Sequence, residues 1–220
     1  MISSAFKALA DVTSPELRSV LWKAIGLTLL LFVLLLVGVQ ALFYFVTLLP
    51  WPWLETVLAF ATGFGLLVLF FFLMVPVTAM FAGLYLDDVA AKVEQKHYGA
   101  DGIGKPLTLM AGLWVSVRFG LLVLVINVLA LPFIFTGIGA LVLITINAYL
   151  LSRQYFEMAA MRFMDPDDAK DFRKDNGLGV FIAGYLPAVM SLVPLLNLIV
   201  PLFATSYFVH LFKRVQKSSV

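Results

Sequence analysis

An arginine near the start of the chain is placed where it could bind an anion. Thr13 or Ser14 can cap the free N–H groups of a helix, and Pro15 suits its first turn, where the missing N–H of proline costs nothing. Arg18 follows three residues later, so its guanidinium would lie close to that turn. Guanidinium and free backbone N–H groups together make a reasonable oxyanion site. The alternative, an arginine that extends along the membrane surface to a lipid phosphate, stays open.

A second candidate lies in the stretch "VPLLNLIVPLFATSYFVHLFKR" (193–214), which places Pro194, Asn197 and Pro201 within eight residues. A broken apolar helix leaves backbone groups unpaired, and in lipid each costs several kcal/mol. Such breaks are therefore expected where protein buries them or where they line a wet path. Asn197 offers donors and an acceptor to a solute there. The alternative is that Asn197 ties the turn together while the prolines only break the helix.

Arg153 and Gln154 lie where another long apolar segment ends, and they are further candidates for the lining of a path through the membrane. Their ambiguity is the same as that of Arg18. A long side chain at this depth can bind a solute, or it can extend to the lipid headgroups.

Enzyme chemistry has little support in the sequence. The absence of cysteine excludes disulfides, thiolate metal sites and cysteine nucleophiles. There is no P-loop and no H-E-x-x-H, and His97 and His210 are the only histidines that could act as a base. The Asp-x-Asp-Asp run at 165–168 fits a capped, solvated helix better than a metal site. We expect a protein that is not an enzyme and holds no cofactor or metal.

The composition indicates which solvent surrounds the chain. Of its 220 residues, 62% are hydrophobic and 13% are charged, and the mean hydropathy is +1.02. Soluble domains average about 25% charged residues. So much apolar surface predicts lipid contact, and a net charge of +2 is too small to suggest nucleic acid as a partner.

Apolar runs divide the chain into elements. The runs 24–49 and 56–85 are each long enough to cross a hydrocarbon core, which needs about 20 helical residues. Between them, 50–55 is a tight turn with two tryptophans. We expect residues 1–23 to form a cytoplasmic N-terminal helix before the first span.

Two later apolar segments are too long for one span and are broken near the middle. Pro132 and the "TGIG" at 136–139 interrupt 119–151, and three prolines interrupt 178–212. Each half of 119–151 is too short to cross alone. The expected fold is an all-α integral membrane protein, a single domain over 1–220, with two long transmembrane helices and two partially penetrating helical hairpins.

The basic residues support one orientation. If 50–55, 132–139 and 194–201 are three tips on one side of the membrane, all 15 lysines and arginines fall on the other side. The positive-inside rule then places both termini in the cytoplasm.

Several stretches resemble a known family. They are "YLDDVAAKVEQKHYG" (85–99) with its Val-Glu pair, "NAYLLSRQYFEMAAMRF" (147–163), and most specifically the proline-flanked turn within 193–214. In these the chain is similar to the CysZ sulfate-permease family, which is grouped with the eukaryotic etoposide-induced proteins. The resemblance runs over most of the length.

The resemblance implies a fold and a function. It implies sulfate uptake across the bacterial inner membrane, feeding cysteine synthesis, by a homo-oligomer without an ATPase. The family's P-G-[LI]-R-R motif stands here at residues 15–19, which assigns sulfate to Arg18, to the N–H of Leu17 and to Ser19. Glu16 replaces the glycine and Ser19 the second arginine, and both changes weaken binding of a dianion. The competing hypothesis is a membrane scaffold or regulator that binds partners through 86–118 and 152–177.

Overall fold

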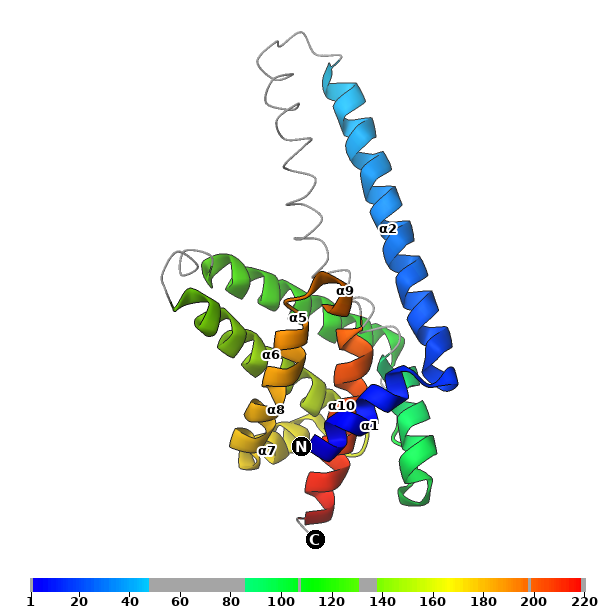
Figure 1. Cartoon of the computed structure of the whole chain (residues 1–220), viewed down its shortest axis with the longest axis vertical. Helices are drawn as coiled ribbons and strands as arrows, with labels where there is room; N and C mark the ends of the chain where they lie inside the picture. The colour runs from blue at the N-terminus through cyan, green and yellow to red at the C-terminus, as the bar shows by residue number, and fades with distance from the viewer. Residues whose placement is uncertain (1, 48–85, 107, 131–137, 198, 219–220) are drawn as a thin grey trace.

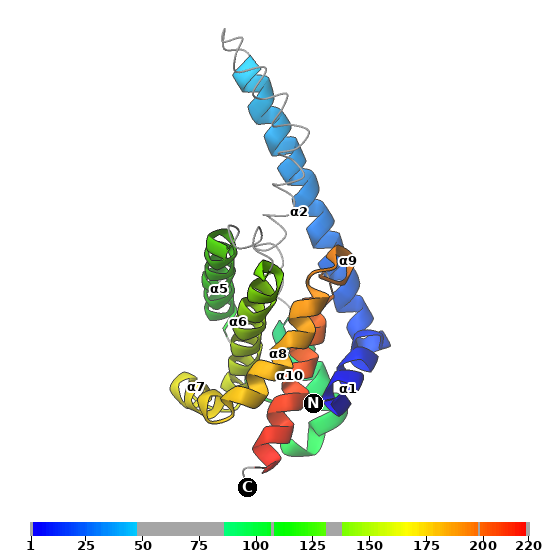
Figure 2. The same cartoon turned by 60° about the vertical axis from the view of Figure 1, so that its left-hand side comes forward.

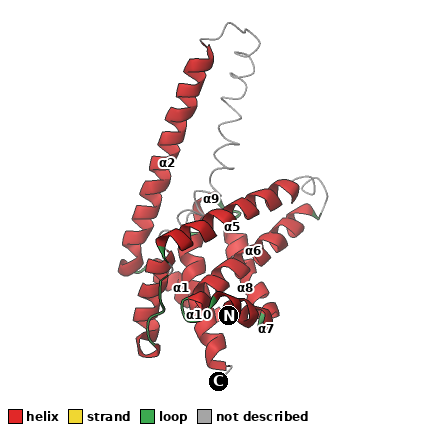
Figure 3. Cartoon of the chain, turned by 180° about the vertical axis from the view of Figure 1, so that it is seen from behind, coloured by secondary structure: helices red, strands yellow, loops and turns green. Residues whose placement is uncertain are grey.

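A computed structural model describes residues 2–47, 86–106, 108–130, 138–197 and 199–218. Within these ranges the regular structure is helical, and they contain no strand (Figure 3). The prediction of an all-α protein is confirmed for this part of the chain.

One long helix, α2, extends away from the others, which gather around the two termini (Figure 1). One helix, over residues 86–98, carries no label in the figures and is called helix 86–98 here. The elements are α1 (Ile2–Val12), α2 (Pro15–Thr47), helix 86–98, the 3-10 turn η2 (Gly99–Asp101), α5 (Leu109–Ala130), α6 (Gly139–Met161), α7 (Pro166–Asp175), α8 (Gly177–Met190), α9 (Pro194–Asn197) and α10 (Val200–Ser218).

Two helices begin at prolines where the sequence predicted helix starts. α2 begins at Pro15 and α7 at Pro166, each at the first helical position, where an N–H would have no partner inside the helix. Asp165 precedes α7 with the extended backbone of an N-cap residue, but its side chain makes no capping hydrogen bond. Residues 1–23, expected as one N-terminal helix, are divided between α1 and α2.

The core forms where α6, α8 and α10 meet. α6 has α5 on one side and α8 and α10 on the other, and α1 packs on α10 (Figure 2). Phe156 of α6 meets Phe212 of α10 edge to face, with ring centroids 6.1 Å apart. α6 and α8 touch at Gly184, where an added Cβ would lie 2.1 Å from the carbonyl oxygen of Ala148. Only glycine permits so close an approach.

Some helix ends differ from the apolar boundaries. α5 begins at Leu109 rather than at 119, α6 continues to Met161 rather than 151, and α10 continues to Ser218 rather than 212. The reason is that lysine, arginine, glutamine and glutamate are good helix formers, so a helix does not end where its sequence becomes polar.

Several expected features lie outside the described residues. They are the turn at 50–55, the span at 56–85, the last two residues of the span at 24–49, and the break at Pro132. The remainder of the first span, 24–47, lies in α2. Judged on the described residues, none of the helices combines the length and the apolar character needed to cross a membrane.

Candidate functional site

The first turn of α2 presents an arginine to solvent. The backbone N–H of Arg18 donates to the carbonyl of Ser14 at 3.0 Å, which fixes the turn. The Arg18 side chain is exposed. Among the described residues its guanidinium has no hydrogen-bond or ion-pair partner. Its donors are therefore available to an anion.

Two lysines from helix 86–98 reach the same turn. The Nζ atom of Lys92 donates to the backbone carbonyl of Glu16 at 2.8 Å, and that of Lys96 lies 3.6 Å from the Glu16 carboxylate. The pKa of Glu16 is lowered because its carboxylate accepts a hydrogen bond from its own backbone N–H and lies beside Lys96. The carboxylate expected to repel an anion here is thus partly neutralised by a lysine that is 80 positions later in the chain.

The other two predicted members of this site, Leu17 and Ser19, flank Arg18 in the sequence, and they differ in their exposure to solvent. The Leu17 side chain is buried in the core, with 1% of its surface exposed, so only its backbone could meet an anion. Ser19 is exposed. Their role in sulfate binding stays a prediction.

The predicted hairpin tip forms the connection from α8 through α9 to α10. The N–H of Asn197, the last residue of α9, donates to the carbonyl of Val193 at 2.8 Å. Pro194 begins α9. Pro201 is buried in the first turn of α10, where its carbonyl accepts a hydrogen bond from Thr205. These contacts are what a broken helix needs to satisfy part of its backbone.

The pair on α6 is engaged within its own helix. Arg153 Nε lies 3.6 Å from the carboxylate of Glu157, and Gln154 Nε2 lies 3.1 Å from the sulfur of Met158. These contacts join neighbours one turn apart, so they do not bring Arg153 and Gln154 to the first turn of α2.

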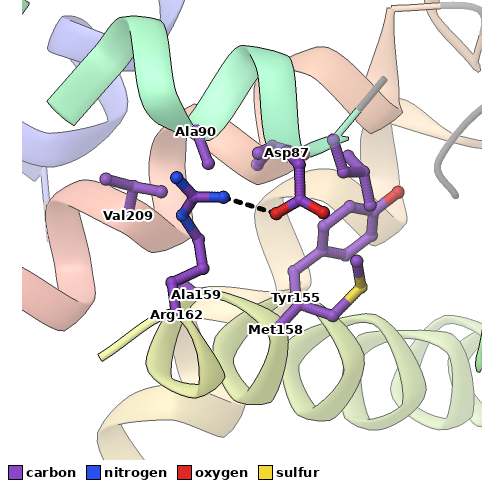
Figure 4. Close-up of a pocket in the computed structure, with 9 residues that line it drawn as sticks. Asp87, Ala90, Tyr155, Met158, Ala159, Arg162 and Val209 are labelled. Carbon is purple, nitrogen blue, oxygen red and sulfur yellow. Dashed lines mark hydrogen bonds and ion pairs between the residues drawn. The ribbon is translucent and has the colours of Figure 1, made fainter. Parts of the chain in front are cut away.

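A buried arginine that the sequence did not single out binds two carboxylates. Arg162, the residue after the end of α6, donates from Nε to Glu94 at 2.8 Å and from Nη2 to the same carboxylate at 3.0 Å. It also donates from Nη1 to Asp87, and the two side chains face each other across a small pocket (Figure 4). Burial opposes the charge of Arg162, but the hydrogen bonds and the charges of both carboxylates raise its pKa.

The hydrogen-bond donors of Arg162 are already used by other groups of the protein. Its Nη2 further contacts the carbonyl of Gly104 at 3.3 Å, while the N–H of Gly104 donates to Glu94 at 2.9 Å. Sulfate would have to displace a carboxylate to reach this guanidinium, because Glu94 and Asp87 both accept hydrogen bonds from it. The Arg162 cluster is therefore a structural tie between helix 86–98, α6 and the segment at Gly104.

A second buried polar cluster surrounds Asp11 of α1. The two carboxylate oxygens meet different histidines: His97 Nε2 at 2.8 Å from Oδ1, and His210 Nε2 at 2.9 Å from Oδ2. Ser206 donates to Oδ2 at 2.8 Å. Burial raises the pKa of Asp11, but the hydrogen bonds from His210, His97 and Ser206 outweigh it and hold that pKa well below its usual range.

Signals for both clusters are weak in the sequence. Glu94 belongs to the Val-Glu pair of the resemblance, and the two histidines stand out only as scarce candidates for a base. An ionisable side chain inside an apolar segment, such as His210, calls for a partner. Which residue supplies it depends on how α1 packs on α10.

Comparison with protein families identifies the chain. The family described as sulfate transporter CysZ/etoposide-induced protein 2.4 matches residues 4–201. The chain belongs to this family. The resemblance seen in the sequence is thereby confirmed, and membership supports a transporter of this general kind. Among curated proteins, none matches the chain.

The family match covers some of the clusters and not others. In this CysZ/etoposide-induced protein family member, the matched range includes the first turn of α2, the Arg162 cluster and α9. It ends before Ser206 and His210. The completed cluster around Asp11 therefore includes residues outside the matched range.

Proposed function

We propose that the protein is a membrane permease for a small oxyanion, with sulfate as its substrate. The observation that carries the proposal is the exposed guanidinium of Arg18 in the first turn of α2, which has no partner among the residues that the structure describes, in a member of a family described as a sulfate transporter. Sulfate at neutral pH only accepts hydrogen bonds, so its site must consist of donors. Leu17 would contribute its N–H and Ser19 its hydroxyl.

Lys92 and Lys96 extend this site. Both contact Glu16, which lies two residues before Arg18, so three cationic side chains gather at one helix start. Positive charge at a helix N-terminus adds to the partial charge of the free N–H groups and attracts a dianion. The lysines thereby offset the loss of the second arginine of the family motif.

The proposed architecture rests on the apolar runs of the sequence. Two spans, at 24–49 and 56–85, would cross the bacterial inner membrane, and hairpins at 119–151 and 178–212 would enter it partway, with both termini in the cytoplasm. Large apolar side chains on α2 and α5 are exposed, as lipid-facing side chains would be: Leu30, Val33, Leu34, Val37, Leu121, Val125 and Leu129. We expect a homo-oligomer in which the proline-flanked turn around Asn197 and the end of the other hairpin, at Arg153 and Gln154, line the path. Sulfate taken up in this way would supply cysteine synthesis.

Uptake of labelled sulfate into vesicles that contain only this protein tests the proposal. Flux above that of empty vesicles, saturable and reduced by Arg18→Ala, is the expected result. Folded protein without flux would overturn it and favour a scaffold that binds partners through 86–118 and 152–177.

A further inference from the structure

The two histidines of the chain converge on one carboxylate. They are 113 positions apart and are the only histidines among 220 residues, yet both direct Nε2 at Asp11, at 2.8 and 2.9 Å. Three elements meet at this point, because Asp11 lies in the last turn of α1, His97 in the last turn of helix 86–98 and His210 in α10. We propose that Asp11, His97 and His210 bind one divalent transition-metal ion of the zinc type.

The donor set fits such an ion. Two imidazole nitrogens and a carboxylate are ligands that Zn²⁺ and its neighbours in the first transition row prefer, and three protein ligands leave a further position open. The ligand atoms all lie within 4.8 Å of one another. Ligands at about 2.0 Å from a tetrahedral ion are about 3.3 Å apart, so modest side-chain rotations place all three around one ion.

Surrounding groups orient the ligands. The hydroxyl of Tyr98 meets His210 Nδ1 at 2.8 Å, so Nε2 is the nitrogen directed at Asp11. Ser206 holds the second carboxylate oxygen at 2.8 Å. Outer hydrogen bonds of this kind fix the ring orientation and tautomer of metal-binding histidines in proteins. A hydroxyl can accept as well as donate, so the Tyr98 oxygen can accept a hydrogen bond from the Nδ1–H group once Nε2 binds the ion.

A metal ion could reach the cluster from solvent, and the Lys96 ammonium group that now lies beside Asp11 could move away from it. Asp11 and His210 are buried, with 2% and 1% of their side-chain surfaces exposed, but His97 is 26% exposed. Lys96 lies 3.4 Å from the Asp11 carboxylate and 3.6 Å from that of Glu16. Because its side chain is 38% exposed, Lys96 can stay with Glu16 when a metal ion takes its place at Asp11.

The composition makes the test selective. The full chain, purified without a polyhistidine tag and stripped with a chelator, is titrated with Co²⁺ and then with Zn²⁺ against a chromophoric chelator. With no cysteine and no other histidine in the chain, visible bands from imidazole-bound Co²⁺ can arise only from His97 or His210. We expect one ion per chain, and at least a tenfold loss of affinity in His97→Gln and in Tyr98→Phe.

Matched controls separate metal binding from folding. Asp11→Asn, which removes the carboxylate ligand, should also lose metal binding. Asp171→Asn makes the same chemical change at an exposed carboxylate and should bind metal as the wild type does. Circular dichroism shows which variants stay folded, and Zn²⁺ should raise the melting temperature of the wild type but not of folded His97→Gln. If the folded wild type gives no stoichiometric Co²⁺ or Zn²⁺ binding, the cluster is a hydrogen-bond network only and the proposal is wrong. Binding that is unchanged in His97→Gln would also overturn it.

Discussion

At the scale of the residue, two arginines show what a guanidinium needs in order to bind an anion. Arg162 donates to Glu94, Asp87 and the carbonyl of Gly104, so the protein already uses its donors. Arg18 is exposed, and within the described residues nothing pairs with it. Because both residues are arginines, only their surroundings determine which of them can offer its donors to an anion.

Arg18→Ala should weaken sulfate binding about ten- to a hundredfold, the effect of losing a charge-assisted hydrogen bond worth roughly 1.5–3 kcal/mol. Glu16→Gln should strengthen it, more so at low salt, because a carboxylate is removed and Lys96 is freed from it. Calorimetric titration with sulfate measures both. Arg214→Ala removes an exposed arginine near the C-terminus and serves as the control. Unchanged binding by Arg18→Ala would place the site elsewhere, with Arg153 and Asn197 the next candidates.

Lys213 should make stability depend on pH. Its side chain is 2% exposed, with Nζ 3.7 Å from the centre of the Phe163 ring, and burial lowers its pKa. The unfolded chain then binds more protons than the folded one between the folded pKa and the ordinary value of about 10.4, so stability rises with pH in that window. Comparing the wild type with Lys213→Met isolates this contribution. Melting temperatures should show the wild type gaining on the variant from neutral pH toward pH 10, and a constant difference would contradict the prediction.

At the scale of the element, buried polar contacts and close packing hold helices that are distant in the sequence. Glu94 and Arg162 are 68 positions apart and join helix 86–98 to α6. Gly184 lets α8 approach the backbone of α6 at Ala148. The first contact fixes which side chains face each other, and the second fixes how near the helices lie.

Glu94→Gln should destabilise the protein by about 3 kcal/mol, the lower end for breaking a buried ion pair, because Asp87 still faces Arg162. Glu157→Gln is the matched control, since Glu157 pairs with Arg173 at 2.7 Å but is 19% exposed and should lose about 1 kcal/mol or less. Denaturant unfolding in detergent measures both. Equal effects of the two variants would show that the Arg162 cluster is not a tie between elements.

Gly184→Ala should destabilise the α6–α8 pair by about 1–3 kcal/mol, the usual cost of overpacking. The new methyl group would lie 2.1 Å from a backbone carbonyl, and backbone can move only if the helices separate. Gly177→Ala, in the same helix, meets nothing within 4 Å and should leave stability unchanged or slightly raised. Thermal unfolding of the two variants side by side tests the close contact. A harmless Gly184→Ala would disprove it.

At the scale of the whole molecule, both termini lie near the same end, and the far end of α2 points away from them (Figures 1 and 2). The proposed orientation also requires both termini on one side of the membrane, with the turn at 50–55 on the other. The basic residues favour the cytoplasm for the side of the termini.

A reporter fused to the C-terminus should be active on the cytoplasmic side, and one inserted after Glu55 should be active on the periplasmic side. The charge distribution causes this, because all 15 basic residues fall on one side of the proposed fold. A periplasmic C-terminal reporter would contradict the orientation. Equal signals from both compartments would show that the charge bias does not fix it.

Local chemistry in the sequence was enough to predict the all-helical class, the helix starts at Pro15 and Pro166, and the family. Proline and capping residues affect only the helix turn in which they lie, and an apolar run indicates by itself whether its segment contacts lipid. These features can therefore be predicted without knowing any contact between distant residues. The two buried clusters depend on contacts between partners that are 68 to 199 positions apart, and no local pattern specifies them. The packing of α1 and helix 86–98 against α6 and α10 decides that Asp11 meets both histidines. The same packing pairs Arg162 with Glu94, while the guanidinium of Arg18 has no partner among the described residues.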